Sequence, residues 1–124
     1  MGGRIESYRD LEVWKLGIEI AKQCYIHIQK FPKDELFGMT SQIRRASASV
    51  PANIAEGYGR DSKGEYIQFL RIAQGSLKEL ETHLILSREV GLTAAAMTEK
   101  PLADCDQPGR MLRSLIRAMP KTVT

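Results

Sequence analysis

Apolar residues recur at alternating spacings of three and four along most of the chain. In the first segment, about residues 9–30, the residues with this spacing are Leu11, Trp14, Ile18, Ala21, Tyr25 and Ile28. Because an α-helix turns once in about 3.6 residues, this spacing places them on one helical face. Four further apolar residues widen the stripe, namely Val13, Leu16, Ile20 and Cys24. A stripe this broad indicates a helix inside a bundle rather than in a two-stranded coil.

The same spacing continues through two more segments, at about residues 35–58 and 62–90. The seam residues are Leu36, Met39, Ile43, Ala46 and Val50 in the second segment and Tyr66, Leu70, Ala73, Leu77, Leu80 and Leu84 in the third. Pro51 lies inside the second segment and predicts a kink, because proline removes one helical hydrogen bond. Gly57 and Gly59 predict the end of the second segment. Asp61 or Ser62 is expected to cap the start of the third segment, and Gly91 is expected to cap its end.

The fourth segment, about residues 94–119, has a weaker pattern. Thr93 is a candidate N-cap, but Pro101, Pro108 and Gly109 interrupt the apolar spacing. We expect a short or kinked helix near residues 94–104 and a firmer helix from about residue 107 to 119. The apolar face of that last helix is expected to be Leu112, Leu115, Ile116 and Met119.

Short joins between long helices make successive helices antiparallel neighbours. The 124 residues are enough for one core without disulfides or metals. The sequence therefore predicts an all-α protein, an antiparallel up-down four-helix bundle that forms a single domain over residues 1–124.

Candidate catalytic and metal-binding residues are few. His27 and His83 are the only histidines, and neither has the HxxxH or HExxH spacing of a zinc site. The Glu-x-x-His pairs of di-iron bundles do not occur. Cys24 falls in an apolar stripe with no histidine at a catalytic spacing, which favours a buried thiol over a nucleophile. We expect no enzymatic activity, no catalytic residues, no cofactor and no metal.

Basic residues cluster in two stretches although the net charge is only +3. Residues 44–60 hold Arg44, Arg45 and Arg60 against one acid, and residues 107–124 hold Arg110, Arg113, Arg117 and Lys121 with no acid. One-sided basic patches favour polyanions, because binding releases condensed counterions. Most proteins with a similar charge balance merely have a soluble basic surface.

Two segments between and within the helices allow more than one interpretation. GYGRDSKGE, residues 57–65, lacks phosphate-loop spacing and favours a helix end followed by a helix start. Arg60, Lys63 and the free amides of the next helix could still hold a phosphate loosely. Arg45, Ser49, Asn53 and Glu56 share one helical face. An internal polar network, with Arg45 bonded to Glu56 or to a neighbouring chain, is favoured over a polyanion-binding stripe.

The chain carries no targeting or membrane signal that we recognise. The N-terminal MGGRIESYRD lacks an apolar signal core and has Glu6 where N-myristoylation needs Ser or Thr. No apolar run approaches the roughly 20 residues of a membrane-spanning helix. We expect a cytoplasmic protein with reduced cysteines and no membrane partner.

Three stretches carry a family resemblance that covers roughly residues 8–92. YRDLEVWKLG, FPKDELFGMTSQIRRASASVPANIAEGYGR and EYIQFLRIAQGSLKELETHL resemble the bacterial four-helix-bundle proteins found in intervening sequences of 23S ribosomal RNA genes, often labelled S23 or IVS proteins. The resemblance implies a ring-like homopentamer without established enzymatic activity. A related branch, the accessory variability determinants of diversity-generating retroelements, forms basic pentamers that bind nucleic acid and a reverse transcriptase.

The residues that match the family's motif are Arg44, Arg45, Asn53, Glu56, Gly57 and Arg60. Among them, the resemblance implies a structural role for Asn53, Glu56 and Gly57. The chain departs from the pattern at Pro101 and at Pro108-Gly109, where relatives run one unbroken helix.

Two hypotheses of function follow. The leading one is a non-enzymatic homo-oligomer that binds RNA or DNA with low specificity through Arg44, Arg45, Arg60, Lys63, Arg110, Arg113 and Arg117. The alternative is a scaffold for protein–protein interaction that uses the small residues of the second segment, among them Ala46, Ala48, Ala52 and Ala55.

Overall fold

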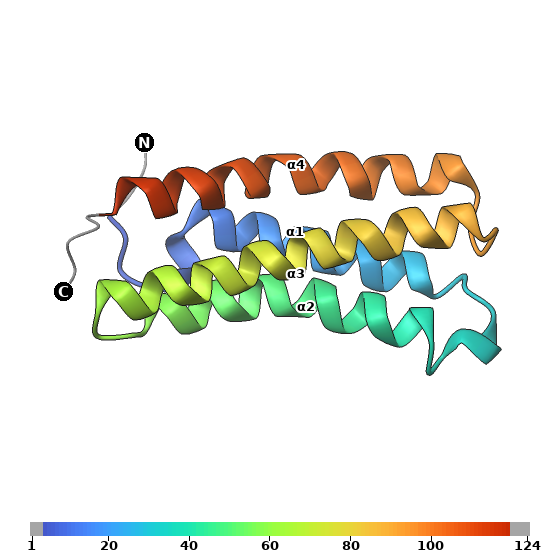
Figure 1. Cartoon of the computed structure of the whole chain (residues 1–124), viewed down its shortest axis with the longest axis horizontal. Coiled ribbons are helices and arrows are strands. Elements are labelled where there is room, and N and C mark those ends of the chain that lie inside the picture. The colour runs from blue at the N-terminus through green and yellow to red at the C-terminus, as the bar shows by residue number, and fades with distance from the viewer. Residues whose placement is uncertain (1–3, 120–124) are drawn as a thin grey trace.

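Four long helices lie side by side, and successive helices run in opposite directions (Figure 1). They are α1 (Glu12–Ile28), α2 (Met39–Tyr58), α3 (Lys63–Glu89) and α4 (Ala95–Ala118), with short 3-10 turns η1 (Tyr8–Asp10) and η2 (Lys33–Glu35). The structure is a computed structural model that describes residues 4–119. The predicted antiparallel four-helix bundle is confirmed.

Each helix packs against two neighbours around the bundle. α2 contacts α1 and α3, α4 contacts the same two helices, and the described parts of α2 and α4 do not contact each other. These two helices are therefore diagonal, which decides how the basic residues of the chain are distributed.

The core confirms most of the predicted seams of α2 and α3 but corrects two parts of the pattern. Leu36, expected in the seam of α2, lies before that helix and is 45% exposed, and the seam of α1 has a different centre. Leu70, Leu77, Leu80 and Leu84 of α3 are buried. On α1 the buried face is centred on Val13, Gly17, Ile20 and Cys24, whereas Tyr25 is 42% exposed. A bundle helix buries a wide face against two neighbours, so the apolar pattern locates the stripe but not its centre.

The expected interruption of the fourth helix was wrong. α4 runs unbroken from Ala95 to Ala118, with Pro101 and Pro108 inside it. Both proline rings are buried, and Thr98, Pro101, Cys105, Pro108 and Leu112 form one core-facing row. Each proline removes one helical hydrogen bond, but its apolar ring fills a core position, and burial of apolar surface stabilises the helix.

Helix ends agree with the sequence in part. The Ser62 hydroxyl accepts a hydrogen bond from the Glu65 amide at 3.1 Å, as expected for the cap of α3. Gly91 follows α3 with a φ of 82°, and the Leu92 amide donates to the Ser87 carbonyl at 2.9 Å, which closes the helix end. Thr93 does not cap α4, because Ala94 precedes the helix and no side chain bonds its first amides.

The second helix starts later than expected. η2 takes up residues 33–35, and α2 begins at Met39. The Glu35 carboxylate accepts a hydrogen bond from the Met39 amide at 3.0 Å, so it satisfies one amide of the first turn of α2. Pro51 lies inside α2 and is buried against α1, where a Cβ on Gly17 would be 3.3 Å from the Pro51 Cβ.

Candidate nucleic-acid interface

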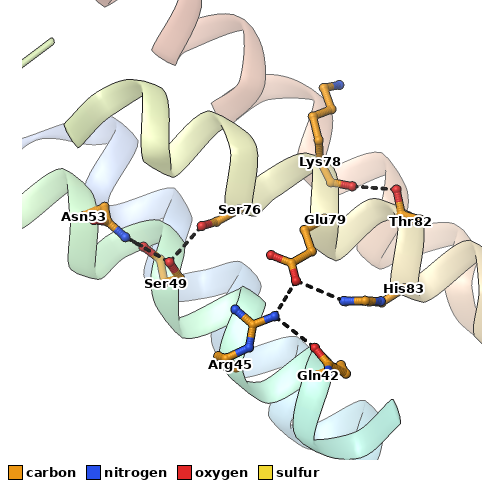
Figure 2. Close-up of polar contacts among 9 residues, drawn as sticks. All are labelled: Gln42, Arg45, Ser49, Asn53, Ser76, Lys78, Glu79, Thr82 and His83. Carbon is orange, nitrogen blue, oxygen red and sulfur yellow. Dashed lines mark hydrogen bonds and ion pairs between the residues drawn. The ribbon is translucent and has the colours of Figure 1, made fainter. Parts of the chain in front are cut away.

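Polar side chains join α2 to α3 along the shared face of these helices (Figure 2). The hydroxyls of Ser49 and Ser76 are 2.8 Å apart. The Asn53 side-chain amide donates to the Ser49 carbonyl at 2.8 Å and to the Ser49 hydroxyl at 2.9 Å. Ser76 is buried, so these bonds satisfy polar groups that would otherwise be destabilising. This arrangement supports a structural role for Asn53.

Arg45 belongs to the same network. Its guanidinium is bonded to the Glu79 carboxylate of α3 and donates to the Gln42 side chain at 2.9 Å. The His83 ring nitrogen lies 3.4 Å from the same carboxylate oxygen. The hydrogen bond from Arg45 is the main cause that lowers the pKa of Glu79, and the bond to His83 adds to it. Of the two partners expected for Arg45, a bond to Glu56 was wrong, because Glu56 is bonded to Arg60 instead.

Two other arginines of the α2 region stack on aromatic rings. Arg60 is bonded to Glu56 at 2.9 Å and its guanidinium carbon is 4.8 Å from the Phe69 ring centroid. The guanidinium carbon of Arg44 is 5.7 Å from the Tyr25 ring centroid. Both arginines remain exposed, but Arg60 is paired with Glu56, whereas no ion pair within residues 4–119 involves Arg44. Lys63 opens α3 at the same end of the bundle as Arg60 and is also exposed.

Arg110 and Arg113 of α4 line a pocket between α3 and α4, which we call the α3–α4 groove. It has a volume of about 430 Å³ and is lined by Arg71, Gln74, Gly75 and Lys78 of α3 and by Gly109, Arg110 and Arg113 of α4. A second hollow adjoins it, shares Arg71, Gln74 and Arg113, and adds Arg117. Lys121 lies outside the described residues.

Among the cations of the groove and the adjoining hollow, two are paired and three are not. Arg110 is bonded to Asp106 at 2.9 Å, and Lys78 to Glu81 at 3.2 Å. Within residues 4–119, no ion pair involves Arg71, Arg113 or Arg117. The groove and its extension therefore keep an excess of positive charge.

The sequence-predicted basic residues do not form one site. Arg44 and Arg45 lie on α2, whereas Arg110, Arg113 and Arg117 lie on the diagonal helix α4. Sequence reasoning missed Arg71, which lies off the apolar seam of α3. Only the pairing of α3 with α4 brings it to the same hollow as Arg113.

Two free thiols lie buried in the core, Cys24 on α1 and Cys105 on α4. Burial raises the pKa of the Cys24 thiol to about 12, and burial is also the main cause that raises the pKa of the Cys105 thiol to about 12. Both thiols are therefore protonated near neutral pH and unsuited to nucleophilic attack. Among the described residues, no group of three or more His, Cys, Asp and Glu side chains could hold a metal ion. None of the helices in the described part is long and apolar enough to cross a membrane.

The fold is that of a small four-helix-bundle protein, in which a polar network joins α2 to α3. The sequence matches the family described as 23S rRNA-intervening sequence protein over residues 9–114. The chain belongs to this family.

A solved structure shares the fold. It is the crystal structure of a protein of unknown function from the S23 ribosomal protein family of Bacteroides thetaiotaomicron VPI-5482. The two sequences are 26% identical, the match covers 86% of this chain and 99% of that chain, and the TM-score is 0.76. No curated protein matches the sequence.

Proposed function

We propose that this protein is a non-enzymatic homo-oligomer that binds RNA or DNA with low sequence specificity. The observation that carries the proposal is a set of three arginines without an ion pair among the described residues. Arg113 and Arg117 lie on α4, and Arg71 lies on the neighbouring helix α3. Arg113 and Arg117 are one helical turn apart, and like charges at this spacing repel each other. An anionic partner would remove this repulsion and release its own counterions.

The surface chemistry favours the phosphate backbone over the bases. Guanidinium groups match the geometry of phosphate oxygens. Sequence readout needs side chains that reach base edges or aromatic platforms for stacking. The α3–α4 groove is lined by no aromatic residue among those described, which is why we expect low specificity.

Oligomerisation would multiply the basic surface. Each protomer has a net charge of +3, and the family resemblance implies a ring of five. A ring would place several groove surfaces on one particle, so a long polyanion could bind more than one and gain avidity without new contacts. The homopentamer is part of the proposal.

Two measurements on the purified protein test the proposal. Light scattering should give a mass of about 70 kDa, five times the 13.9 kDa protomer. Binding to a mixed-sequence RNA and to single-stranded DNA should weaken steeply with salt, because each phosphate contact contributes about −0.7 to the slope of log K against log salt. Binding that does not change between low and moderate salt would refute the polyanion interpretation.

A second function is favoured by the outer face of α2. Ala48 and Ala52 are exposed there, and small side chains allow another helix to approach closely. The protein would then be a scaffold whose α2 face docks other subunits or a partner protein. Ala52→Leu should change the assembled mass, whereas Ala96→Leu, at an exposed position of α4, should not. An unchanged mass for both variants would contradict this use of α2.

A further inference from the structure

We propose that the α3–α4 groove is a phosphate-binding site that takes the backbone of a single-stranded nucleic acid, with Arg71 and Arg113 as its principal ligands. This inference rests on the proposed nucleic-acid role and assigns it to one side of the bundle. Arg71 was not among the residues expected from the sequence. The two arginines come from different helices and line both adjoining hollows.

The charge balance of the groove supports an anionic ligand. Its two acids are already occupied, since Asp106 is bonded to Arg110 and Glu81 to Lys78. That leaves Arg71, Arg113 and, in the extension, Arg117 without a bonded acid in the described part of the chain. All three are exposed, so their guanidiniums can donate to a ligand without a large desolvation penalty.

Gly75 gives independent support from the backbone. It lies in the interior of α3, where glycine is unfavourable by about 1 kcal/mol relative to alanine. A Cβ at this position would meet nothing within 4 Å, so packing inside the protomer does not require glycine. Gly75 lines the groove, and the missing side chain leaves room for a ligand to approach the helix backbone.

The two adjoining hollows together form a path for a single strand. The groove of about 430 Å³ continues into the second hollow, which Arg117 lines, so successive phosphates of one strand could follow it. The Lys78 side chain points away from the α2–α3 network (Figure 2) and toward this side of α3.

The test measures fluorescence anisotropy of a labelled uridine oligonucleotide of about 20 nucleotides at several salt concentrations. Arg71→Gln and Arg113→Gln should each weaken binding roughly tenfold at low salt, because each removes a charge-assisted hydrogen bond. Each should also make the salt slope shallower by about 0.7. Lys100→Gln removes an exposed cation of α4 that does not line the groove, and should leave binding within about twofold.

Gly75→Ala separates binding from stability. The added methyl group should raise the melting temperature by about 4 °C while lowering affinity for the oligonucleotide several-fold. If Gly75 does not face the ligand, Gly75→Ala should raise the melting temperature and leave the affinity for the oligonucleotide unchanged, which would count against the role of Gly75 in the groove. Circular dichroism of every variant confirms that each is folded before its affinity is compared.

The outcomes distinguish the groove from the proposed function. If the wild type binds the oligonucleotide and only Arg44→Gln weakens it, the polyanion surface lies on α2; the groove assignment is overturned and the proposed function stands. If uridine monophosphate, measured by calorimetry, binds as tightly as the oligonucleotide and Arg71→Gln abolishes both, the phosphate site is upheld for a small ligand and the nucleic-acid role fails. If the wild type binds neither probe at low salt, both proposals are refuted.

Discussion

Two glycines of this bundle should respond in opposite directions to the same substitution. At Gly57, near the end of α2, an added Cβ would lie 2.8 Å from the Phe69 Cβ and 3.1 Å from the Tyr66 carbonyl oxygen. Carbon atoms pack best at about 3.5–4.0 Å, and neither neighbour is the far end of a flexible side chain. Gly57→Ala therefore requires α2 and α3 to separate locally.

The change in unfolding free energy of Gly57→Ala follows from two opposing contributions. Overpacking in a well-packed core costs about 1–3 kcal/mol. The better helix propensity of alanine returns at most about 1 kcal/mol, and less near the end of a helix. We expect Gly57→Ala to lose about 1–2 kcal/mol of unfolding free energy, whereas Gly75→Ala should gain about 1 kcal/mol because its Cβ meets open space.

The assay is thermal and urea unfolding followed by circular dichroism. An unfolding entropy of about 2.1 cal/mol/K per residue converts 1 kcal/mol into about 4 °C for a chain of this length. Both variants should be compared with the wild type at one protomer concentration, because assembly raises apparent stability by mass action. A Gly57→Ala protein as stable as the wild type would refute the close approach of α2 to α3.

Three further predictions concern the core, pH and the interhelical ion pair. Leu80→Ala, at a fully buried position, should lose about 2–5 kcal/mol of unfolding free energy in urea titrations. His27 is 7% exposed, and burial, aided by Lys30, lowers its pKa below the ordinary 6.5. As pH falls, the His27 ring therefore takes up a proton more readily in the unfolded chain than in the folded one, so stability should fall as pH drops below about 6.5. Urea midpoints measured from neutral to acidic pH should show a smaller loss for His27→Gln. A double-mutant cycle of Arg45→Gln and Glu79→Gln should give a coupling of about 0.2–1 kcal/mol that shrinks at high salt, because both side chains are partly exposed; zero coupling at low salt would contradict the pairing.

The helices and their order are largely encoded locally. The apolar rows of α2 and α3, such as Val50 with Ile54 and Leu77 with Leu80, repeat with the period of a helix and are buried in the structure. Ser62 begins α3 and Gly91 follows its end, each through hydrogen bonds to residues a few positions away. Such features depend on residues a few positions apart, so sequence reasoning recovers them.

The fourth helix shows where local rules were insufficient. Pro101 and Pro108 predict an interruption from backbone chemistry alone. In the structure both rings face the core and α4 continues, because burying an apolar ring offsets the lost hydrogen bond. The pattern that reveals this is the row of Thr98, Pro101, Cys105, Pro108 and Leu112, which has the spacing of a seam once proline is counted as apolar.

By itself the sequence determined the all-helical class, the antiparallel order, the family and the basic character of residues 107–119. Only the tertiary structure decided which basic residues share a surface. It placed α2 and α4 diagonally, tied Arg45 to Glu79, and set Arg71 across a groove from Arg113. The physical reason is that helix formation is governed by neighbours in sequence, whereas a surface that joins two helices depends on how their buried faces are rotated against each other.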